Sequence, residues 1–395
     1  MKRVLVLLIG EVLEDPRVHR TCTSLAAAEA AVTVACTNPS GRPDHETVDG
    51  LTVFRFPHRT EFFLKRLYVW LKSRINPKVG GVLGRSHEDV PDSSVKAALR
   101  NAAAAMNFRH YLNGSMKINR LFVDRFTGKA FDLVHCNDFD TLSAGCSLKR
   151  SGFAKQLLYD SHEYWPGIGA RGSRPNDAIR NVERIGIADA DYVVTVNSMI
   201  AELLRDDYDL TETPSVVMNC PYRYDGDLSL DTVHDPVRVI YQGKLQAFRG
   251  LDDLVGAFRH IEGAVLTLSG YGPLEESLKL LAESYGLSDS VTVTGRYDPG
   301  EALAILSRHD IGVMPFRDAT VSIRLSSPNK LFDYSMAGLA LAATDLPFIG
   351  KMIGDCDAGM VFDEASPEKI ARTLNRMIGD RDTPVSYTHL TLPTN

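Results

Sequence analysis

The chain has 395 residues, which is more than one ordinary domain needs and fits two domains of about 150–200 residues each. Hydrophobic residues make up 44% of it, as in a typical globular protein, and no apolar run reaches the roughly 18–20 residues that a membrane-spanning helix requires. The net charge of −6 is uneven, because residues 1–120 hold 18 Lys and Arg against 11 Asp and Glu. The sequence therefore predicts a basic face on the first half of the protein.

Cysteines are scattered, without the spacing of a zinc site or a disulfide framework; they are Cys22, Cys36, Cys136, Cys146, Cys220 and Cys356. They indicate a reducing compartment. Residues 1–9 form a short apolar stretch followed by Gly10 and Glu11 instead of a cleavage site, which predicts a first strand rather than a signal peptide. We expect a cytoplasmic protein.

Short apolar stretches alternate with amphipathic ones, the pattern of parallel α/β sheets. In the first half, the predicted strands are Val4–Ile9, Val32–Cys36, Leu51–Phe56, Leu133–Cys136, Gln156–Tyr159 and Tyr192–Val196. Helices are predicted between them, for example at Val18–Ala30 and Ile179–Ala188. The first domain is predicted to span residues 1–220.

The loop after the first predicted strand runs from Gly10 to His19. Asp15 is suited to cap a helix and Pro16 to be its first residue. Gly10 can bring the backbone close to a bound phosphate. Arg17 is either a cation in a ligand cleft or the partner of a surface ion pair.

Residues 59–78 hold six basic residues and one acid among large apolar side chains. On a helix, Phe63, Leu67, Trp70 and Leu71 share one face, so the segment can lie on an anionic membrane surface. The alternative is a helix packed on its own sheet with a solvated basic edge. We expect the first of these to place the protein on the inner face of the membrane.

Acidic and histidine side chains follow two predicted strands of the first half. His135 and Asp138 end the first stretch, and His162 and Glu163 end the second. Doubly wound sheets bind ligands at the carboxyl ends of their strands, where a histidine can hydrogen-bond an acceptor hydroxyl or a sugar ring.

A polar segment with Pro, Gly and Asp follows, and we predict a hinge at residues 221–236. A second series of strands then begins, at Val237–Tyr241, Val265–Ser269, Val291–Thr294, Ile311–Pro315 and Leu339–Ala343. The second domain is predicted to span residues 237–384. Two such domains imply a cleft that binds a ligand.

The loop Val239–Leu251 ends a strand and opens a helix. Gly243 lets the backbone turn tightly, and Lys244 and Arg249 flank the loop, where both could face one diphosphate. Fixed cations in a dry cleft stabilise the negative charge of such a group. The alternative is a solvated loop.

Three further loops of the second half hold candidate residues. Gly270 and Gly272 in Ser269–Glu275 are expected to shape the floor of the site, and Arg296 ends the next strand. In Ser326-Ser-Pro-Asn-Lys-Leu-Phe-Asp-Tyr-Ser-Met-Ala-Gly338, Asp333 can accept hydrogen bonds from two neighbouring sugar hydroxyls. The helix start upstream favours negative charge, and Lys330 could reach phosphate or pair with Asp333.

This last segment resembles the PNK-x-FEY-x-x-AG signature of glycosyltransferases with the GT-B architecture, two facing Rossmann-like domains. The chain is similar to glycosyltransferase family 4 from about residue 2 to about residue 380. The D-P-R-V of residues 15–18, the strand end at Leu133–Asp138 and the loop at residues 243–250 contribute to this resemblance.

The resemblance implies a retaining transfer of a sugar from a nucleoside-diphosphate sugar to a hydroxyl acceptor. It assigns Gly243, Lys244 and Arg249 to the diphosphate, Asp333 to the ribose and backbone near Arg296 to the nucleobase. The donor site would also include Gly10, Gly270, Gly272, Ser327, Asn329 and Lys330. His162 would act in catalysis with Lys244 and Arg249, and His135, Asp138, His162 and Glu163 would face the acceptor.

Two positions depart from the family pattern. The first glutamate of the family's acidic pair is Leu325 here, and the second histidine of the first strand-end motif is Asn137. Ser326, Ser327, Asn329 or a backbone group could contact the sugar instead. These departures leave open a catalytically weak nucleotide-binding protein, and a nucleotide-sugar epimerase is a further alternative.

Other signals are weaker. D-x-D recurs along this acid-rich chain, too often to indicate a metal site. No G-x-G-x-x-G follows the first strand, which disfavours a dinucleotide oxidoreductase. We expect no metal or cofactor beyond the donor, a glycan or lipid-linked acceptor, a role in surface-polysaccharide or lipid-linked glycan assembly, and no nucleic acid partner. Residues 385–395 resemble a non-native read-through tail, so the family's C-terminal crossing helix is expected to be missing.

Overall fold

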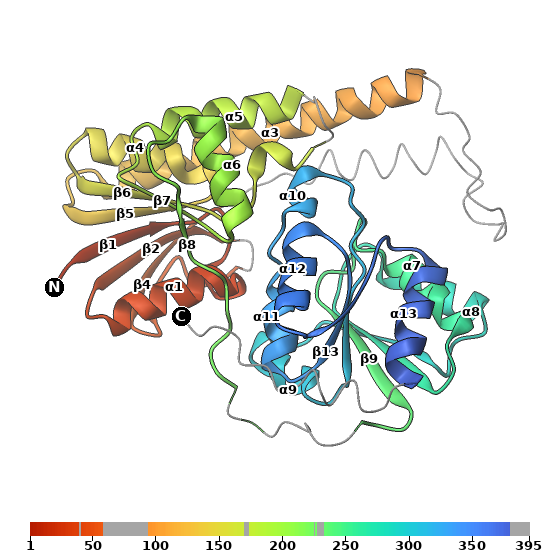
Figure 1. The fold of residues 1–395 in the computed structure, drawn as a ribbon. Coiled ribbons are helices and arrows are strands. Elements are labelled where there is room, and N and C mark those ends of the chain that lie inside the picture. Colours follow the sequence, from red (N-terminus) through yellow and green to blue (C-terminus); the bar gives the residue numbers. More distant parts are fainter. Residues whose placement is uncertain (39–40, 58–93, 170–173, 225, 227–232, 380–395) are drawn as a thin grey trace. The chain divides into compact units, whose positions relative to one another are not determined.

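The computed structural model describes residues 1–38, 41–57, 94–169, 174–224, 226 and 233–379. Side chains are described from residue 109 onward in the long helix that begins at Ser94, and from residue 177 in the helix that begins at Arg174. The density of contacts divides the chain into two compact units, Met1–Val194 and Thr195–Asn395. Each unit is built around its own sheet (Figure 1).

The first sheet has the strand order β3-β4-β2-β1-β5-β6-β7-β8. Its strands are β1 (Arg3–Leu7), β2 (Ala31–Thr37), β3 (His45–Val48), β4 (Leu51–Phe56), β5 (Phe131–Asn137), β6 (Ala154–Ser161), β7 (Tyr192–Thr195) and β8 (Ser215–Val216). The strands from β4 through β6 are parallel, and β3 runs antiparallel to β4 at the edge. The carboxyl ends of β4, β2, β1, β5 and β6 therefore share one edge of the sheet.

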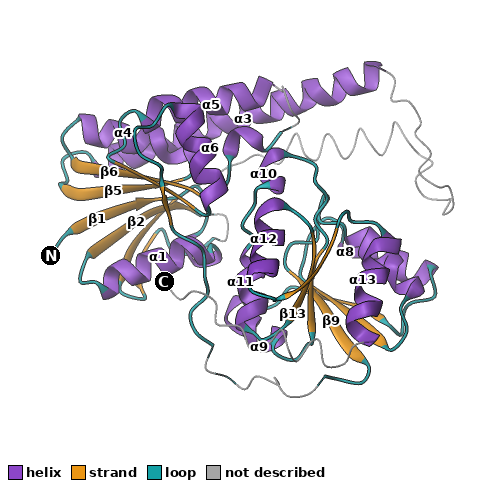
Figure 2. Cartoon of the chain, viewed as in Figure 1, coloured by secondary structure: helices purple, strands orange, loops and turns teal. Residues whose placement is uncertain are grey.

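Helices cover both faces of this sheet. Figure 2 shows α1 (Pro16–Ala27) on one face and α3 (Ser94–Phe126), α4 (Leu142–Arg150) and α5 (Arg174–Ile187) on the other. Three short 3-10 helices, η1 (Val12–Glu14), η2 (Phe139–Thr141) and η3 (Trp165–Gly167), lie in the loops that follow β1, β5 and β6. The last helix before the second sheet is α6 (Ser198–Tyr208).

The second sheet is parallel in the order β11-β10-β9-β12-β13-β14. Its strands are β9 (Val237–Gln242), β10 (Ala264–Ser269), β11 (Val291–Gly295), β12 (Ile311–Met314), β13 (Ala340–Thr344) and β14 (Gly359–Phe362). Its helices are α7 (Leu251–Ala257), η4 (Phe258–His260), α8 (Glu275–Ser284), η5 (Pro299–Glu301), α9 (Ala302–Leu306), α10 (Val321–Arg324), α11 (Asn329–Met336), α12 (Pro347–Asp355) and α13 (Pro367–Gly379).

Burial explains the apolar strands of the second sheet. Every residue of β12 and β13 is buried, as expected for central parallel strands with helices on both faces. Ala340, Ala342 and Ala343 leave room for those helices, while Leu341 and Val313 fill the core.

The predicted architecture is confirmed. Two parallel-sheet, Rossmann-like units are present, and each predicted strand overlaps an observed one. The prediction missed β3, β8 and β14. The structure confirms the capping of α1: Asp15 Oδ1 accepts hydrogen bonds from the N–H groups of Arg17 and Val18, and Pro16 is the first helical residue.

Several predictions fall outside what the structure tests. The contact-based division lies at residues 194 and 195, whereas the sequence places the domain boundary at residue 220 and a hinge at 221–236; those bounds stay predictions. The basic segment at residues 59–78 and the tail at 385–395 lie outside the described residues. In the part of the chain that is described, no helix has the length and apolar character needed to cross a membrane.

Candidate functional site

The loops after β9 and β10 lie against each other in the second unit. The N–H of Gly243 donates to Ser269 O over 2.8 Å, and the N–H of Leu245 donates to Tyr271 O over 2.9 Å. Gly243 has a φ of 133°, which a residue with a side chain rarely adopts. The tight turn predicted at Gly243 therefore joins the two loops at the carboxyl edge of the sheet.

Gly270 and Gly272 permit this close approach. A Cβ atom on Gly270 would overlap the carbonyl oxygen of Gly243, and one on Gly272 would overlap that of Leu245. The two glycines thus support the loop that holds Lys244 and Arg249. That they shape the floor of a ligand site stays a prediction.

Three cations converge above this floor. Lys330 on α11 places its Nζ 4.9 Å from the centre of the Tyr241 ring, and an added Cβ on Gly243 would lie 2.6 Å from the same atom. Burial, followed by the positive charges of Arg249 and Lys244, lowers the pKa of Lys330 to about 7 against the opposing effect of Asp333. Lys244 and Arg249 are therefore close enough to act on one ammonium group.

The cations lack carboxylate partners. Among the residues that the structure describes, none of Lys244, Arg249 and Lys330 forms an ion pair. Lys244 is exposed, whereas Arg249 is half-buried with its guanidinium 4.7 Å from the centre of the Phe316 ring. The result is a local excess of positive charge, which favours an anionic ligand.

The position of Lys330 follows from the anchoring of α11. The ring of Tyr334 lies against Gly312 of β12, where a Cβ would overlap it, and its hydroxyl accepts a hydrogen bond from the N–H of Gln242 over 2.9 Å. Because Lys330 lies one helical turn before Tyr334, its side chain is directed to the end of β9.

Asp333 is half-buried on the same helix. Burial and then the charge of Asp333 raise the pKa of Tyr297 to about 12, and Asp333 also opposes the lowering of the Lys330 pKa. The carboxylate thus lies near both the cation cluster and the loop after β11. Arg296 in that loop is exposed and stacks over the Tyr271 ring at 4.0 Å, so the two form a platform beside the glycine loops.

The loop before α11 contains the other predicted donor contacts. Ser327 Oγ is buried without a hydrogen-bond partner in the described structure, whereas Ser326 Oγ donates to Ile323 O over 2.8 Å. Asn329 begins α11, and its Oδ1 accepts a hydrogen bond from Asn219 Nδ2 over 2.7 Å, within the second unit. Leu325 directly follows α10 (Val321–Arg324) and supplies no acid.

In the first unit, a second polar cluster lies at the carboxyl ends of β5 and β6. Asp160 is 2% exposed and binds Arg17 Nη2 over 2.6 Å. The prediction of a surface ion pair for Arg17 is therefore wrong, because Asp160 binds Arg17 in the interior. Its role as a cation in a ligand cleft stays a prediction.

The two histidines approach the same carboxylate. His135 Nε2 lies 3.4 Å and His162 Nε2 lies 3.5 Å from Asp160 Oδ2, and neither makes a hydrogen bond of good geometry there. His162 Nδ1 lies 3.3 Å from Asp138 Oδ2. Both nitrogens of the His162 ring thus face carboxylates of the protein.

Asp138 fixes the loop that holds His162. Its Oδ1 accepts hydrogen bonds from the His162 N–H over 3.0 Å and from Trp165 Nε1 over 2.7 Å. Its φ of 62° is unusual for a residue with a side chain, and such strain often occurs at functional sites. Asn137, which replaces a family histidine, donates to Leu7 O over 3.0 Å and so connects strands.

The charges in this cluster are strongly coupled. Burial opposes a charge on His162, but Asp138 and Asp160 outweigh it and raise the His162 pKa to about 9. Burial raises the pKa of Asp138 to about 6. The pKa of Asp160 is well below its usual range, because His162 and Arg17 outweigh the effect of burial. At neutral pH the cluster therefore contains a protonated His162 between two carboxylates.

The remaining predicted residues of the first unit are Glu163 and Gly10, and neither is buried. Glu163 is exposed. Gly10 accepts a hydrogen bond from Thr37 N–H over 3.0 Å, and an added Cβ would meet only Leu8, at 3.6 Å. Within the described ranges, no group of three or more His, Cys, Asp or Glu side chains is arranged to hold a metal ion.

Sequence reasoning missed two parts of these sites. Asp160 lies two residues before His162 at a strand end, a position that could have drawn attention to it. Tyr111 on α3 hydrogen-bonds the carboxylate of Asp140, whose pKa is raised to about 7 by burial and by Asp138. The helix segment around Tyr111 has no motif that would predict this contact.

Comparison with known families identifies the chain. Residues 15–220, just over half of it, match the model described as glycosyl transferase 4-like domain. The chain belongs to this family. Residues 229–389 also match the model described as glycosyl transferases group 1. The matched regions cover both sheets except β1, and the predicted family is confirmed.

Individual relatives are more distant. A protein of Mycobacterium tuberculosis named GDP-mannose-dependent alpha-(1-6)-phosphatidylinositol monomannoside mannosyltransferase is 29% identical over 153 residues, which span 38% of this chain and 40% of that protein. The chain thus matches less than half the length of this curated relative.

Solved structures extend over nearly the whole chain. Sucrose-phosphate synthase from Thermosynechococcus elongatus superposes with a TM-score of 0.64 at 16% identity, over 98% of this chain and 92% of that one. HepE from Anabaena, solved in complex with UDP, gives a TM-score of 0.60 at 12% identity over 98% and 93%. At these identities the likeness shows the GT-B fold alone, which agrees with the prediction.

Proposed function

We propose that this protein is a retaining glycosyltransferase that moves a sugar from a nucleoside-diphosphate sugar to a hydroxyl acceptor. The observation that carries the proposal is the cluster of Lys244, Arg249 and Lys330, which lack carboxylate partners in the described structure. The charges of Arg249 and Lys244 help to lower the pKa of Lys330. Such a cluster is costly without an anion. A diphosphate would offset its repulsion.

The reaction makes direct use of these charges. The acceptor oxygen forms a bond to the anomeric carbon, and the bond from that carbon to the β-phosphate oxygen breaks. The acceptor proton passes to the departing phosphate, so no separate nucleophile of the protein is required. Lys244, Arg249 and Lys330 would stabilise the charge that develops on the nucleoside diphosphate.

The other donor contacts follow from the same surface. Asp333 would accept hydrogen bonds from the ribose hydroxyls, and the Arg296–Tyr271 platform would support the nucleobase. Ser327, whose buried hydroxyl has no partner in the described structure, and Asn329 would contact the transferred sugar in place of the acid missing at Leu325. The proposed site needs no metal ion, because the cations of the protein replace one.

The first unit would bind the acceptor. His162 is protonated at neutral pH, so we assign it a fixed positive charge rather than the role of a general base. Asp138, His135 and Glu163 would complete the acceptor side, and Gly10 would approach the donor phosphate. The glycolipid named for the mycobacterial relative supports a lipid-linked or surface-polysaccharide acceptor. Residues 59–78 would then contact an anionic membrane on its cytoplasmic side.

Transfer assays with a matched variant test the proposal. UDP-, GDP-, ADP- and dTDP-sugars are incubated with the protein, with and without a panel of glycan and glycolipid acceptors. Arg249→Ala is compared with Arg259→Ala, because Arg259 stacks over Tyr285 at the same 4.7 Å but lies away from the glycine loops. Arg249→Ala should reduce kcat by about 10²–10³-fold, and Arg259→Ala should not.

Two results would count against the proposal. Equal transfer rates for Arg249→Ala and Arg259→Ala would remove the diphosphate role. Conversion of the donor sugar without any acceptor would favour an epimerase. Asp333→Ala is expected to raise KM for the donor more than it lowers kcat, and an unchanged KM would contradict the ribose role.

A further inference from the structure

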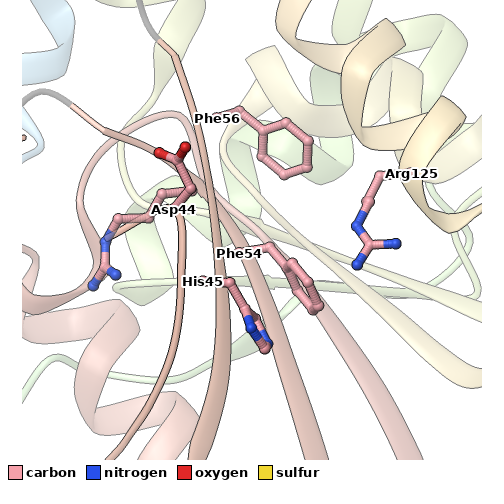
Figure 3. A pocket seen from close by; sticks show the side chains of 6 residues that line it. Asp44, His45, Phe54, Phe56 and Arg125 are labelled. Carbon is pink, nitrogen blue, oxygen red and sulfur yellow. The ribbon is translucent and has the colours of Figure 1, made fainter. Parts of the chain in front are cut away.

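A cavity of about 350 Å³ opens on the first unit beside the edge of its sheet. Figure 3 shows its walls, which are formed by Asp44, His45, Phe54, Arg55, Phe56 and Arg125. Its volume lies at the small end of the range for ligand pockets and suits one or two sugar rings rather than a nucleotide sugar. All six of these residues belong to the first unit.

Aromatic side chains form the apolar wall of the cavity. His45 and Phe54, paired across β3 and β4, stack with their ring centroids 4.5 Å apart. Phe56 meets Phe122 of α3 edge-to-face at 5.1 Å. Phe54 and Phe56 are both half-buried, so each leaves apolar surface at the cavity.

The charges on the two sides of this wall differ. Arg125 is exposed, with its guanidinium 4.4 Å from the centre of the Phe54 ring, and Lys129 Nζ lies 5.3 Å from the same ring. Within the described residues neither forms an ion pair. Burial lowers the pKa of Lys129, and the nearby charges of Arg125 and Arg3 lower it further. Positive charge thus accumulates on this side without compensation.

The other charged groups of the cavity are accounted for. Arg55 is neutralised by Glu11 over 2.7 Å and by Glu46 over 2.6 Å. Asp44 is exposed, and Figure 3 shows it across Phe54 and Phe56 from Arg125. The cavity therefore offers a cation on one side, an acceptor for hydroxyl groups on the other and aromatic surface between them.

We propose that this cavity binds a negatively charged sugar unit of the glycan acceptor. Arg125, with Lys129 beside it, would bind the carboxylate or phosphate of that unit, Asp44 would accept its hydroxyl groups, and Phe56 would pack against its ring. This inference rests on the proposed function, since it names the class of acceptor.

The position of the cavity in the fold agrees with this role. Its residues Phe54–Phe56 lie at the carboxyl end of β4, the same edge of the sheet as Asp138 after β5. Strand β4 is three positions from β5, about 14 Å at the usual spacing between strands. Two residues of α3 that are about one turn apart connect these places: Asn119 donates a hydrogen bond to Asp140 O over 2.6 Å, and Phe122 packs on Phe56. The cavity would thus hold a sugar unit distant from the reacting hydroxyl.

Direct binding without a donor tests the proposal. Titration calorimetry compares an oligogalacturonate, a neutral oligosaccharide of equal length and glucose 6-phosphate, so that carboxylate, phosphate and uncharged probes are separated. At least one acidic probe should bind at least about tenfold more tightly than the neutral one, and added salt should weaken that binding. Arg125→Glu should abolish the preference.

A matched variant and a folding control make the result decisive. Arg120→Glu reverses an exposed charge on the same helix, away from the cavity, and should keep the preference. Thermal unfolding of both variants shows that they are folded. Equal binding of acidic and neutral probes would overturn the proposal, as would equal behaviour of Arg125→Glu and Arg120→Glu. Binding of acidic probes by a protein that transfers no sugar would instead overturn the proposed function alone.

Discussion

Lys330 should make nucleotide binding depend on pH. Its pKa is about 7 in the ligand-free protein, because burial and the charges of Arg249 and Lys244 disfavour the ammonium form. A diphosphate bound among these cations would restore the charge, so binding must take up protons. The expected uptake is about 0.5 proton per nucleotide at pH 7 and about 0.9 at pH 8, and affinity should fall by about tenfold from pH 6 to pH 8.

Calorimetry in two buffers of different ionisation enthalpy measures this uptake. UDP and GDP are titrated at pH 8, where the terminal phosphate of the nucleotide is already ionised. Lys330→Met is the control, since it keeps the length of the side chain but cannot bind a proton, and its uptake should be near zero. Binding by the unaltered protein with no proton uptake at pH 8, or with the same uptake in Lys330→Met, would refute this account of the cluster.

The same pKa sets the stability of the ligand-free protein. Because the folded-state pKa of Lys330 is depressed below that of an unfolded lysine, the unfolded chain binds more protons between about pH 7 and pH 10.5. The contribution of Lys330 to stability must therefore rise with pH across this window. Urea unfolding at several pH values should show a smaller rise in Lys330→Met than in the unaltered protein.

Three further predictions concern the supports of the two sites. Gly270→Ala should lower the free energy of unfolding in urea by about 3 kcal/mol and abolish nucleotide binding, because its Cβ would overlap Gly243 O. Gly286 has a φ of 70° and open space around it. Gly286→Ala should therefore cost only about 1 kcal/mol and leave binding intact. Equal effects of the two would disprove the packing argument. Asp160→Asn should cost about 3–5 kcal/mol, because it removes the carboxylate that binds the buried Arg17 guanidinium. Asp132→Asn, which removes an exposed ion pair, should change stability little. Similar losses in both variants would contradict a buried network. The folded-state pKa of His162 is raised to about 9, so its contribution to stability is complete below about pH 6.5 and is lost as pH rises to 9. In His162→Gln, the free energy of unfolding should therefore decline less over this range. An unchanged decline would show that the charge lies elsewhere.

The sequence predicts most of the fold because apolar strands and amphipathic helices alternate with clear periods. The missed strands have physical reasons. In β3, His45–Val48, the side chains alternate between exposed and half-buried and only one of four is apolar, so no core pattern marks the strand. In β14 only Phe362 is buried, and both residues of β8 are exposed, so neither strand has a core pattern.

The candidate sites were predictable where they depend on topology. Parallel strands bring their carboxyl ends to one edge, so residues such as Lys244, His135 and His162 could be named from their place after a strand. Contacts between side chains distant in sequence could not. The pairing of Arg17 with Asp160 spans 143 residues, and the burial of Lys330 beside Tyr241 depends on how Tyr334 packs on β12. Those positions follow from tertiary packing, which no local pattern encodes.

The central claim is that the cations of the second unit bind the diphosphate of a donor. Calorimetric titration with a nucleoside diphosphate and with the matching nucleoside separates the phosphate contribution from that of the base. The account predicts that the diphosphate binds at least about 100-fold more tightly than the nucleoside, and that the doubly substituted Lys244→Ala, Arg249→Ala protein loses most of this difference. Equal affinities for nucleoside and diphosphate in the unaltered protein would contradict it.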